Sequence, residues 1–329
     1  MDIISERAKE LTESYPKTAT KTLASMLVEE FAPTLTLENA RSRVRYLRGQ
    51  NGKRNRNKRN MKSAVKVERS APPPAMPEAL KEFDDWQFRQ LRAKRVLVLS
   101  DVHCPYHDET ELKLAVDKGL EMGVDAVLFN GDLMDFFSIS RWQKDPRNRN
   151  FKREVEMGRE MLAYFRETFK GAQIWWKLGN HEERWEAFMW NKAPEVVGIE
   201  DFEIESWMQT AKHNIRVIRN MEPIRVNKLT ILHGHEYKFA ISNPVNPARG
   251  LYLRSKVPTV MGHLHQTSEH TESNLNGTIC TTWSTGCLCN LRPSYSPLNK
   301  WNLGFAIIDT TGEEDFTVHN YRIWDGRIM

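Results

Sequence analysis

The sequence has few cysteines and no long apolar run, and each absence narrows the class of protein. Four cysteines occur in 329 residues, and none of their spacings is the CxxC of a zinc knuckle or redox pair. No apolar run reaches the ~20 residues that cross a bilayer, and charge interrupts the first residues too early for a signal peptide. We therefore expect a cytoplasmic protein with reduced thiols and no membrane partner. The cysteines are Cys104, Cys280, Cys287 and Cys289.

Positive charge is concentrated in one segment. The net charge of the chain is +5, but residues 41–69 alone carry +11 and the remainder carries −6. Charge gathered in this way usually has a polyanionic partner, so we expect nucleic acid to bind here. The side chains predicted to contact it are Arg41, Arg45, Arg48, Lys53, Arg54, Arg56, Lys58 and Arg59.

Residues 1–50 predict three short helices. Apolar residues recur at helical spacing over 3–14 and again before Pro33, and Thr36 is placed to cap a third helix that Gly49 ends. Three short helices with a basic last one resemble a helix-turn-helix module. A small helical bundle whose arginines are merely solvated fits the pattern equally well. Both interpretations stay open.

Residues 51–90 are expected to form a linker. The stretch 50–60 has no apolar residue, and Pro72, Pro73 and Pro74 follow as a stiff extended segment. The basic part of such a tether can bind phosphate backbones without sequence preference.

Residues 91–329 alternate predicted strands with helices, which is typical of an α/β fold. The first strand covers 95–100, a helix capped by Asp108 runs to Gly123, and a strand follows at 124–129. A long amphipathic helix is expected at 152–170. Further strands are expected at 173–178, 229–232, 259–261 and 278–283, before a terminal hairpin of 305–310 with 316–323.

Five polar clusters each follow one of these predicted strands, where α/β folds place their sites. One such cluster arises easily by chance, but these five hold six of the ten histidines in the chain. We therefore expect the five strand ends to form one site. The clusters are Asp101-Val102-His103, Gly131-Asp132-Leu133-Met134-Asp135, Gly179-Asn180-His181-Glu182, His233-Gly234-His235 and Gly262-His263-Leu264-His265.

The order and spacing of the clusters resemble the calcineurin-like metallophosphoesterases, whose pattern is DxH, GDxxD, GNH(D/E), a strand-terminal His and GHxH. The resemblance covers about residues 95–309 and implies a double β-sandwich flanked by helices, here preceded by the small all-α module. It also implies two bound metal ions. The first would be held by Asp101, His103 and His265, the second by Asn180, His233 and His263, with Asp132 bridging both.

The ligand set suits borderline divalent ions. We expect Mn²⁺ first, with Fe²⁺, Zn²⁺ or Ni²⁺ as alternatives. In this family two ions about 3.5–4 Å apart activate a bridging hydroxide that attacks phosphorus. The resemblance gives His181 and Asp132 catalytic roles, with His181 protonating the leaving oxygen or steadying the transition state. Three residues are expected to orient the ligand imidazoles or water by hydrogen bonds: Asp135, His235 and Glu182. For Glu182, an ordinary carboxylate in a turn remains the alternative.

Differences between this chain and the motifs of individual phosphoesterase subfamilies narrow the class of substrate. Protein phosphatases continue GDxxD with an Arg, whereas Phe136 stands there in this chain. GDLMD is closer to the GDLFD of SbcD-like DNA repair nucleases, and the arrangement looks like phage proteins. We therefore expect a phosphodiesterase or nuclease acting on nucleic acid. The alternatives are a small-molecule phosphomonoesterase or nucleotide phosphatase, and a non-enzymatic nucleic-acid-binding regulator with a structural metal site.

Overall fold

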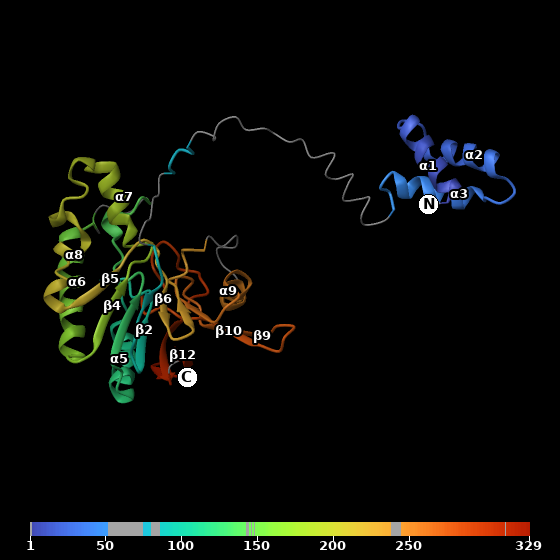
Figure 1. Ribbon diagram of the computed structural model, residues 1–329. Helices are drawn as coiled ribbons and strands as arrows, with labels where there is room; N and C mark the ends of the chain where they lie inside the picture. The colour runs from blue at the N-terminus through green and yellow to red at the C-terminus, as the bar shows by residue number, and fades with distance from the viewer. Residues whose placement is uncertain are drawn as a thin grey trace. The chain divides into compact units, whose positions relative to one another are not determined.

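The computed structural model divides into two compact units, Met1–Leu80 and Lys81–Met329 (Figure 1). It describes residues 2–51, 75–79, 86–142, 145, 147, 149–237, 245–312 and 314–329. Most of the predicted linker therefore lies outside the described residues. In the described part of the chain, no helix has the length and apolarity needed to cross a membrane.

The N-terminal unit contains the three predicted helices, α1 (Ile3–Ser14), α2 (Thr20–Phe31) and α3 (Leu37–Leu47). Asp2 and Thr36 cap α1 and α3, because their side chains accept backbone N–H groups of the first turn. The helices enclose their own core. Its buried members are Ala8, Leu11, Leu23, Ala24, Leu27, Leu35, Ala40 and Val44.

The C-terminal unit is built on two sheets, which confirms the predicted α/β fold class with its two-sheet sandwich. The six-stranded sheet has the order β1-β6-β7-β8-β10-β9 and the seven-stranded sheet the order β13-β12-β11-β2-β3-β4-β5. The strands of the first are β1 (Arg89–Gln90), β6 (Ile224–Val226), β7 (Leu229–Ile231), β8 (Thr259–Met261), β9 (Ser268–Ser273) and β10 (Ile279–Ser284). Those of the second are β2 (Arg95–Leu99), β3 (Ala126–Asn130), β4 (Gln173–Lys177), β5 (Ile215–Ile218), β11 (Leu303–Thr311), β12 (Asp315–Trp324) and β13 (Arg327–Ile328).

The strand period of two explains how the layers pack. Val96 and Val98 of β2 point to one face and form a core with Val260 of β8 in the other sheet. The alternate residues Leu97 and Leu99 lie in a second core with side chains of the covering helices. Strand β2 is thus apolar on both faces, as a central strand between two layers must be.

The helices of this unit are α5 (Glu109–Met122), α6 (Phe151–Thr168), α7 (Glu183–Lys192), α8 (Ile204–Trp207) and α9 (Pro247–Ser255). Short 3₁₀ turns occupy Phe137–Ile139, Pro194–Val196, Glu200–Phe202 and Ala211–His213. As predicted, Asp108 caps α5 and Gly123 ends it in the left-handed conformation. The terminal hairpin is also confirmed, with β11 and β12 antiparallel along their length.

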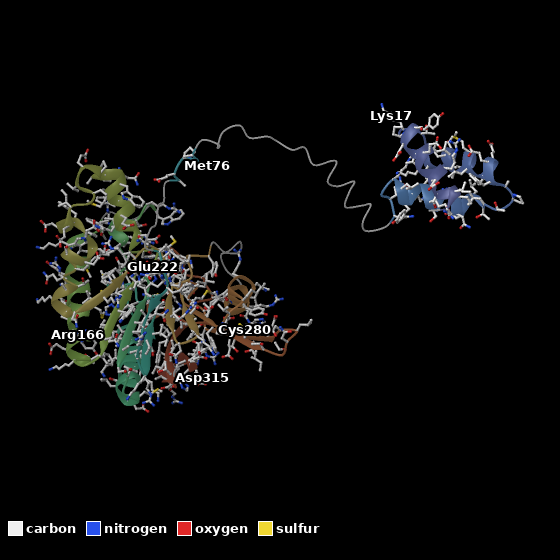
Figure 2. The ribbon with its side chains drawn as sticks, in the orientation of Figure 1. Lys17, Met76, Arg166, Glu222, Cys280 and Asp315 are labelled. Atoms are coloured by element: carbon white, nitrogen blue, oxygen red, sulfur yellow. The ribbon has the colours of Figure 1, made fainter. Side chains whose placement is uncertain are left out.

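Strand β1 was not predicted. Arg89 and Gln90, placed at the end of the predicted linker, pair in parallel with β6. Arg89 is held there by Glu222, which is labelled in Figure 2. The two carboxylate oxygens of Glu222 lie 2.5 and 2.8 Å from the guanidinium. A two-residue strand carries too short an apolar pattern for sequence periodicity to reveal it.

Strand direction brings the polar clusters together. In the seven-stranded sheet β2, β3 and β4 are parallel neighbours, and in the six-stranded sheet β7, β8 and β10 are parallel neighbours. Parallel strands end at the same edge of their sheet. Each of the five clusters follows one of these strands within two residues, so both sheets deliver polar side chains to one place.

Candidate metal centre

The first group of converging donors contains the residues assigned to the first metal. The Nε2 atom of His103 lies 3.3 Å from Nε2 of His265, and His265 Nε2 lies 3.1 Å from Oδ1 of Asp101. His103 Nε2 is also 4.0 Å from Oδ1 of Asp101 and 4.0 Å from Oδ2 of Asp132. Four donor atoms from both sheets thus surround one point, as ligands of a single ion do.

The second group contains the residues assigned to the second metal. The Nε2 atom of His233 lies 3.3 Å from Oδ2 of Asp132 and 3.3 Å from Oδ1 of Asn180. His263 offers a nitrogen that lies within 4.8 Å of the donor atoms of Asp132 and His233. Oδ2 of Asp132 therefore faces both groups, where a bridging ligand would lie.

Buried charge shows that this site fits divalent cations. Asp101 and Asp132 are 0% and 1% exposed, and among the described residues neither has a Lys or Arg as ion-pair partner. Burial by itself raises the pKa of both carboxyls, but the neighbouring imidazoles lower it below the usual range. Two buried carboxylates surrounded by imidazoles need positive charge, and ions at these positions supply it.

The ligand imidazoles are oriented through their other ring nitrogen. Nδ1 of His103 lies 3.0 Å from a carboxylate oxygen of Asp135, and Nδ1 of His233 lies 2.7 Å from the carbonyl oxygen of Asn130. Both acceptors require an N–H at Nδ1, which leaves each Nε2 lone pair free for a metal. Asp135 is therefore placed for the supporting role that the sequence assigned to it.

The carboxylate of Glu182 accepts hydrogen bonds from backbone N–H groups rather than from a ligand imidazole. Its buried carboxylate accepts the N–H groups of Asp132 at 2.9 Å, Met134 at 2.8 Å and Gly179 at 2.7 Å. Burial and the nearby Asp132 raise the pKa of Glu182 to about 7. The side chain ties the loop after β3 to the loop after β4, and so fixes the bridging Asp132 relative to Asn180.

His181 has a partner that sequence reasoning missed. Its Nδ1 lies 2.9 Å from the carbonyl oxygen of Asp135, and its Nε2 lies 2.8 Å from Nη2 of Arg184. Arg184 also donates to the same Asp135 carbonyl at 2.7 Å. Because a guanidinium only donates, Nε2 of His181 accepts and the ring is neutral in this arrangement. The only sequence signal for Arg184 is its position one helical turn after His181.

A buried ion pair beside His233 was also missed. Nζ of Lys177 lies 2.9 Å from Oε1 of Glu236, and Glu236 accepts the backbone N–H groups of His233 and Gly234 at 3.0 and 2.6 Å. The pair therefore shapes the loop that presents His233. His235, predicted to support a ligand, instead contacts Glu183 at 2.8 Å through its Nε2.

The backbone is left-handed at five of the seven assigned ligands. The φ angles of Asp101, His103, Asp132, His263 and His265 are 56°, 52°, 52°, 67° and 54°. Asp and His are among the residues that adopt this left-handed region more readily, and such conformations gather at functional sites.

Two motif glycines permit the close approach of these loops. A Cβ at Gly131 would lie 2.2 Å from Nδ1 of His233, and one at Gly179 would lie 2.3 Å from Oδ1 of Asp132. Any larger residue at either position would displace a ligand.

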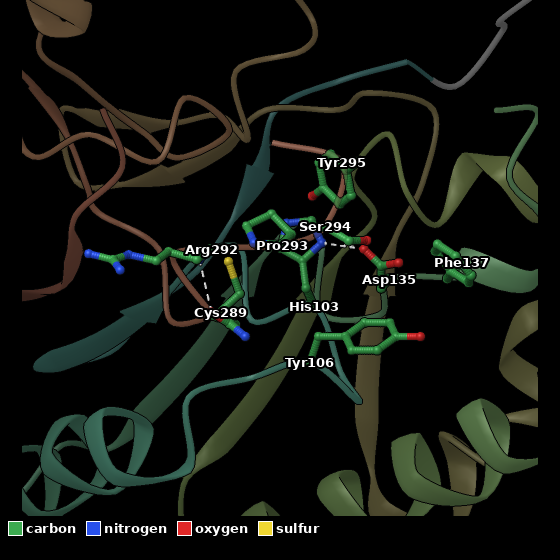
Figure 3. A pocket seen from close by; sticks show the side chains of 10 residues that line it. His103, Tyr106, Asp135, Phe137, Cys289, Arg292, Pro293, Ser294 and Tyr295 are labelled. Carbon is green, nitrogen blue, oxygen red and sulfur yellow. Dashed lines mark hydrogen bonds and ion pairs between the residues drawn. The ribbon is translucent and has the colours of Figure 1, made fainter. Parts of the chain in front are cut away.

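A cavity of about 430 Å³ opens beside the first group of donors. His103 and Asp135 line it on the side of the donors, and Tyr106, Phe137 and Tyr295 line it with aromatic rings (Figure 3). Further polar lining comes from Asn290, Arg292 and Ser294. Phe136, the chain neighbour of Phe137, is instead fully buried in the core.

The predicted nucleic-acid contacts are only partly described. Arg41 and Arg45 both pair with Glu38, at 3.1 and 3.5 Å. Arg48 donates to the backbone carbonyl of Tyr15 at 3.2 Å and so holds α3 against the turn after α1. The predicted contacts that lie outside the described residues are Lys53, Arg54, Arg56, Lys58 and Arg59.

Comparison with known proteins identifies the class. The model of the calcineurin-like phosphoesterase family matches residues 94–284. This is more than half of the chain, and the chain belongs to that family. It is a metal-dependent phosphoesterase, as the motifs predicted, and the family relies on a dinuclear metal centre.

Among curated proteins, the chain is similar to two phage proteins. The Gene 54 protein of Mycobacterium phage L5 is 24% identical over 234 residues, spanning 67% of this chain and 91% of the relative. The Gene 54 protein of Mycobacterium phage D29 is 25% identical over 234 residues, spanning 67% and 90%. The resemblance to phage proteins is thereby confirmed.

Solved structures are more distant. A single mutant of Vps29 from Entamoeba histolytica is 14% identical with a TM-score of 0.36, covering 71% of this chain and 96% of its own. The phosphoesterase Yfce from E. coli is 12% identical with a TM-score of 0.31, covering 65% and 88%.

Proposed function

We propose that this phosphoesterase hydrolyses phosphodiester bonds of nucleic acid. The observation that carries the proposal is the aromatic cavity beside the first donor group, lined by Tyr106, Phe137 and Tyr295. Aromatic faces stack on nucleobases whatever their sequence, at roughly 1–3 kcal/mol per base. A base seated there would bring its adjoining phosphate toward His103 and Asp135 at the metal centre.

The basic segment supports a polymeric substrate. Residues 41–69 carry +11, which suits binding to a phosphate backbone rather than to one small ester. A tethered binder also raises the local concentration of the strand at the site. Within the described part of α3, Arg41 and Arg45 pair with Glu38, so residues beyond the helix are expected to supply most of this binding.

The chemistry is divided between bound ions and side chains. Two divalent ions, when held by the assigned ligands, would polarise the phosphoryl group and lower the pKa of water. His181 is steadied through Nδ1 by the carbonyl oxygen of Asp135 and accepts from Arg184 at Nε2, so it would protonate the leaving oxygen only after Nε2 exchanges that hydrogen bond for a proton. Arg184 supplies positive charge beside His181. The Arg that follows GDxxD in protein phosphatases is absent here, because Phe136 stands at that position. We propose that His181 acts with Arg184 as a pair.

A substrate panel tests the proposal. Metal-stripped protein is supplied in turn with Mn²⁺, Fe²⁺, Zn²⁺ and Ni²⁺ and assayed on bis-p-nitrophenyl phosphate, p-nitrophenyl phosphate, DNA and RNA. We expect metal-dependent cleavage of the diester and of at least one nucleic acid. Turnover of the monoester alone would identify a small-molecule phosphatase. Nucleic-acid binding without turnover of any ester would identify a regulator.

The basic segment has its own test. Changing Lys53, Arg54, Arg56, Lys58 and Arg59 together to Gln should weaken DNA or RNA binding and flatten its salt dependence. The slope of log K against log salt should become shallower by up to about 0.9 for each phosphate of duplex DNA that the variant no longer neutralises. Turnover of bis-p-nitrophenyl phosphate should be unchanged, because none of these residues belongs to the metal centre.

A matched control changes exposed cations elsewhere in the chain to Gln. Lys113, Lys152 and Lys170 pair with acids on helix surfaces of the phosphoesterase unit, and their Gln variants should bind nucleic acid as the parent does. Equal salt slopes for the parent and the five-residue variant would show that the segment does not bind the phosphate backbone.

A further inference from the structure

A sixth group of side chains reaches the edge where the metal ligands meet. Strand β10 is parallel to β8, with Ser284 beside Met261, so its carboxyl end lies at the same edge as those of β7 and β8. The residues that follow β10 include Cys287, Leu288 and Cys289. From the sequence, these cysteines were expected only to be reduced thiols.

Backbone hydrogen bonds fix the CxC loop against the loop that carries Asp101 and His103. The N–H of Leu288 donates to the carbonyl of Asp101 at 3.1 Å, and the N–H of Asn290 donates to the carbonyl of Tyr106 at 2.9 Å. The carbonyl of Leu288 accepts from Asp108 at 2.9 Å. The position of Cys289 between two of these bonds is therefore set by the fold.

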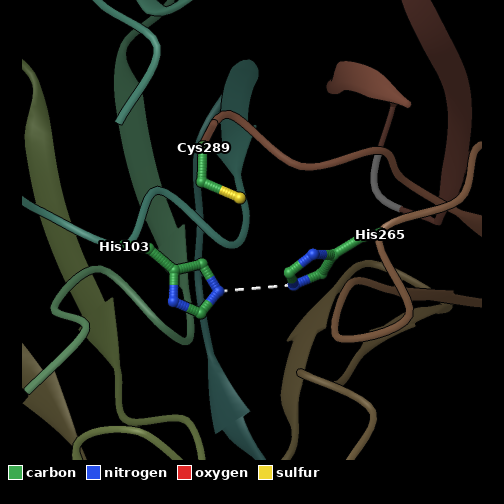
Figure 4. A group of neighbouring side chains, drawn as sticks. All are labelled: His103, His265 and Cys289. Carbon is green, nitrogen blue, oxygen red and sulfur yellow. Dashed lines mark hydrogen bonds between the residues drawn. The ribbon is translucent and has the colours of Figure 1, made fainter. Parts of the chain in front are cut away.

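The Cys289 sulfur points toward the first donor group. Its Sγ atom and ring nitrogens of His103 and His265 all lie within 4.8 Å of one another (Figure 4). The side chain is 3% exposed and also borders the aromatic cavity. Metal–sulfur and metal–nitrogen bonds of about 2.3 and 2.1 Å place two ligands of one ion no more than about 4.4 Å apart. A small inward adjustment brings all three atoms onto one ion.

We infer that Cys289 is an additional ligand of the first metal, beside Asp101, His103, Asp132 and His265. The inference rests on the dinuclear centre of the proposed function and adds a thiolate that the sequence-derived ligand set lacked. On binding, the S–H proton of Cys289 leaves to solvent and a sulfur–metal bond forms. A thiolate shifts the preference of this position from Mn²⁺ toward softer ions such as Zn²⁺, Co²⁺ and Fe²⁺.

Cys287 provides a matched control. It is buried like Cys289 and lies two residues away. Its thiol interacts with His265 and Cys289, and its Sγ is 3.6 Å from the carbonyl oxygen of Asn302, but it belongs to none of the converging donor groups found among the described residues. Cys287→Ser removes a thiol of the same loop without removing the proposed ligand. Cys289→Ser and Cys289→Ala remove the ligand with and without a replacement oxygen.

The test is the absorption spectrum of the full-length protein loaded with Co²⁺. Visible d–d bands report that Co²⁺ occupies the centre, and a near-ultraviolet thiolate-to-cobalt charge-transfer band reports sulfur coordination. The parent and Cys287→Ser should show both. Both Cys289 variants should keep the d–d bands and lose the charge-transfer band. Competition titrations should then show a lower ratio of Zn²⁺ to Mn²⁺ affinity in Cys289→Ser.

The outcomes separate this inference from the proposed function. A parent protein with d–d bands but no charge-transfer band overturns the role of Cys289 and leaves the dinuclear centre intact. A charge-transfer band that survives in both Cys289 variants likewise overturns it. No d–d bands in the parent would mean that the assigned ligands do not hold a metal, and the proposed function would fail with the inference.

Discussion

Asp132→Asn is expected to abolish phosphoesterase turnover while leaving the protein folded. Oδ1 of Asp132 accepts the backbone N–H of His181 at 2.9 Å, and an Asn carbonyl oxygen can keep that bond. The amide NH₂ group then takes the place of Oδ2, the atom that faces both donor groups. A hydrogen-bond donor cannot bind a cation, and one negative charge is removed from a buried site.

The expected effect is large, because the bridging carboxylate serves both ions. Ions at such a centre contribute several kcal/mol to transition-state stabilisation, so kcat should fall by roughly 10³-fold or more at about 1.4 kcal/mol per factor of ten. Bound metal, measured by elemental analysis after dialysis, should fall as well. Asp117→Asn is the control, since Asp117 is an exposed carboxylate on α5 that pairs with Lys113. If Asp132→Asn keeps the metal content and turnover of the parent, Asp132 does not bridge the two ions.

Lys177→Met is expected to destabilise the phosphoesterase unit more than any surface change. Lys177 is fully buried, and its Nζ contacts Glu236 at 2.9 Å and the carbonyl oxygen of Glu222 at 2.8 Å. Removing one partner of a buried ion pair leaves the other charge uncompensated, which costs about 3–5 kcal/mol. At ~2–4 °C per kcal/mol for a unit of this size, Tm should fall by about 6–20 °C in thermal melts.

A double variant and a pH series distinguish charge from packing. Adding Glu236→Gln to Lys177→Met removes the stranded charge and should restore part of the stability. Burial alone raises the pKa of the Glu236 carboxyl. The positive charges beside it outweigh burial and lower that pKa to about 2; they come from Lys177, His235 and His233. The stabilisation by the pair should therefore be fully present above the usual carboxyl pKa of 4.5 and decline as pH falls toward 2. If the double variant melts no higher than Lys177→Met, poorer packing rather than charge explains the effect.

Local patterns in the sequence were enough to predict much of the fold. The caps at Asp108 and Thr36, the end of α5 at Gly123 and the β11–β12 hairpin are encoded within a few residues of chain. The strand-end clusters could be recognised in the same way, because each lies within five consecutive residues. Their order along the chain then indicated the family.

Contacts that depend on strand order could not be predicted in this way. Lys177 ends β4 and Glu236 follows β7, and these strands belong to different sheets, so nothing in either local pattern joins them. Cys289 has the same difficulty, since its proximity to His265 depends on β10 running parallel to β8. Arg184 could be placed one turn from His181, but the shared carbonyl of Asp135 is a tertiary contact.

The assigned ligands of each ion come from both sheets of the sandwich. Asp101 and His103 follow a strand of one sheet and His265 a strand of the other, and Asn180 and His233 are divided in the same way. An ion bound by either ligand group would therefore connect the six-stranded sheet to the seven-stranded sheet at one edge. Ions that bind only the folded chain add free energy that grows with the logarithm of their concentration. We therefore expect the melting temperature of this protein to rise with the concentration of metal.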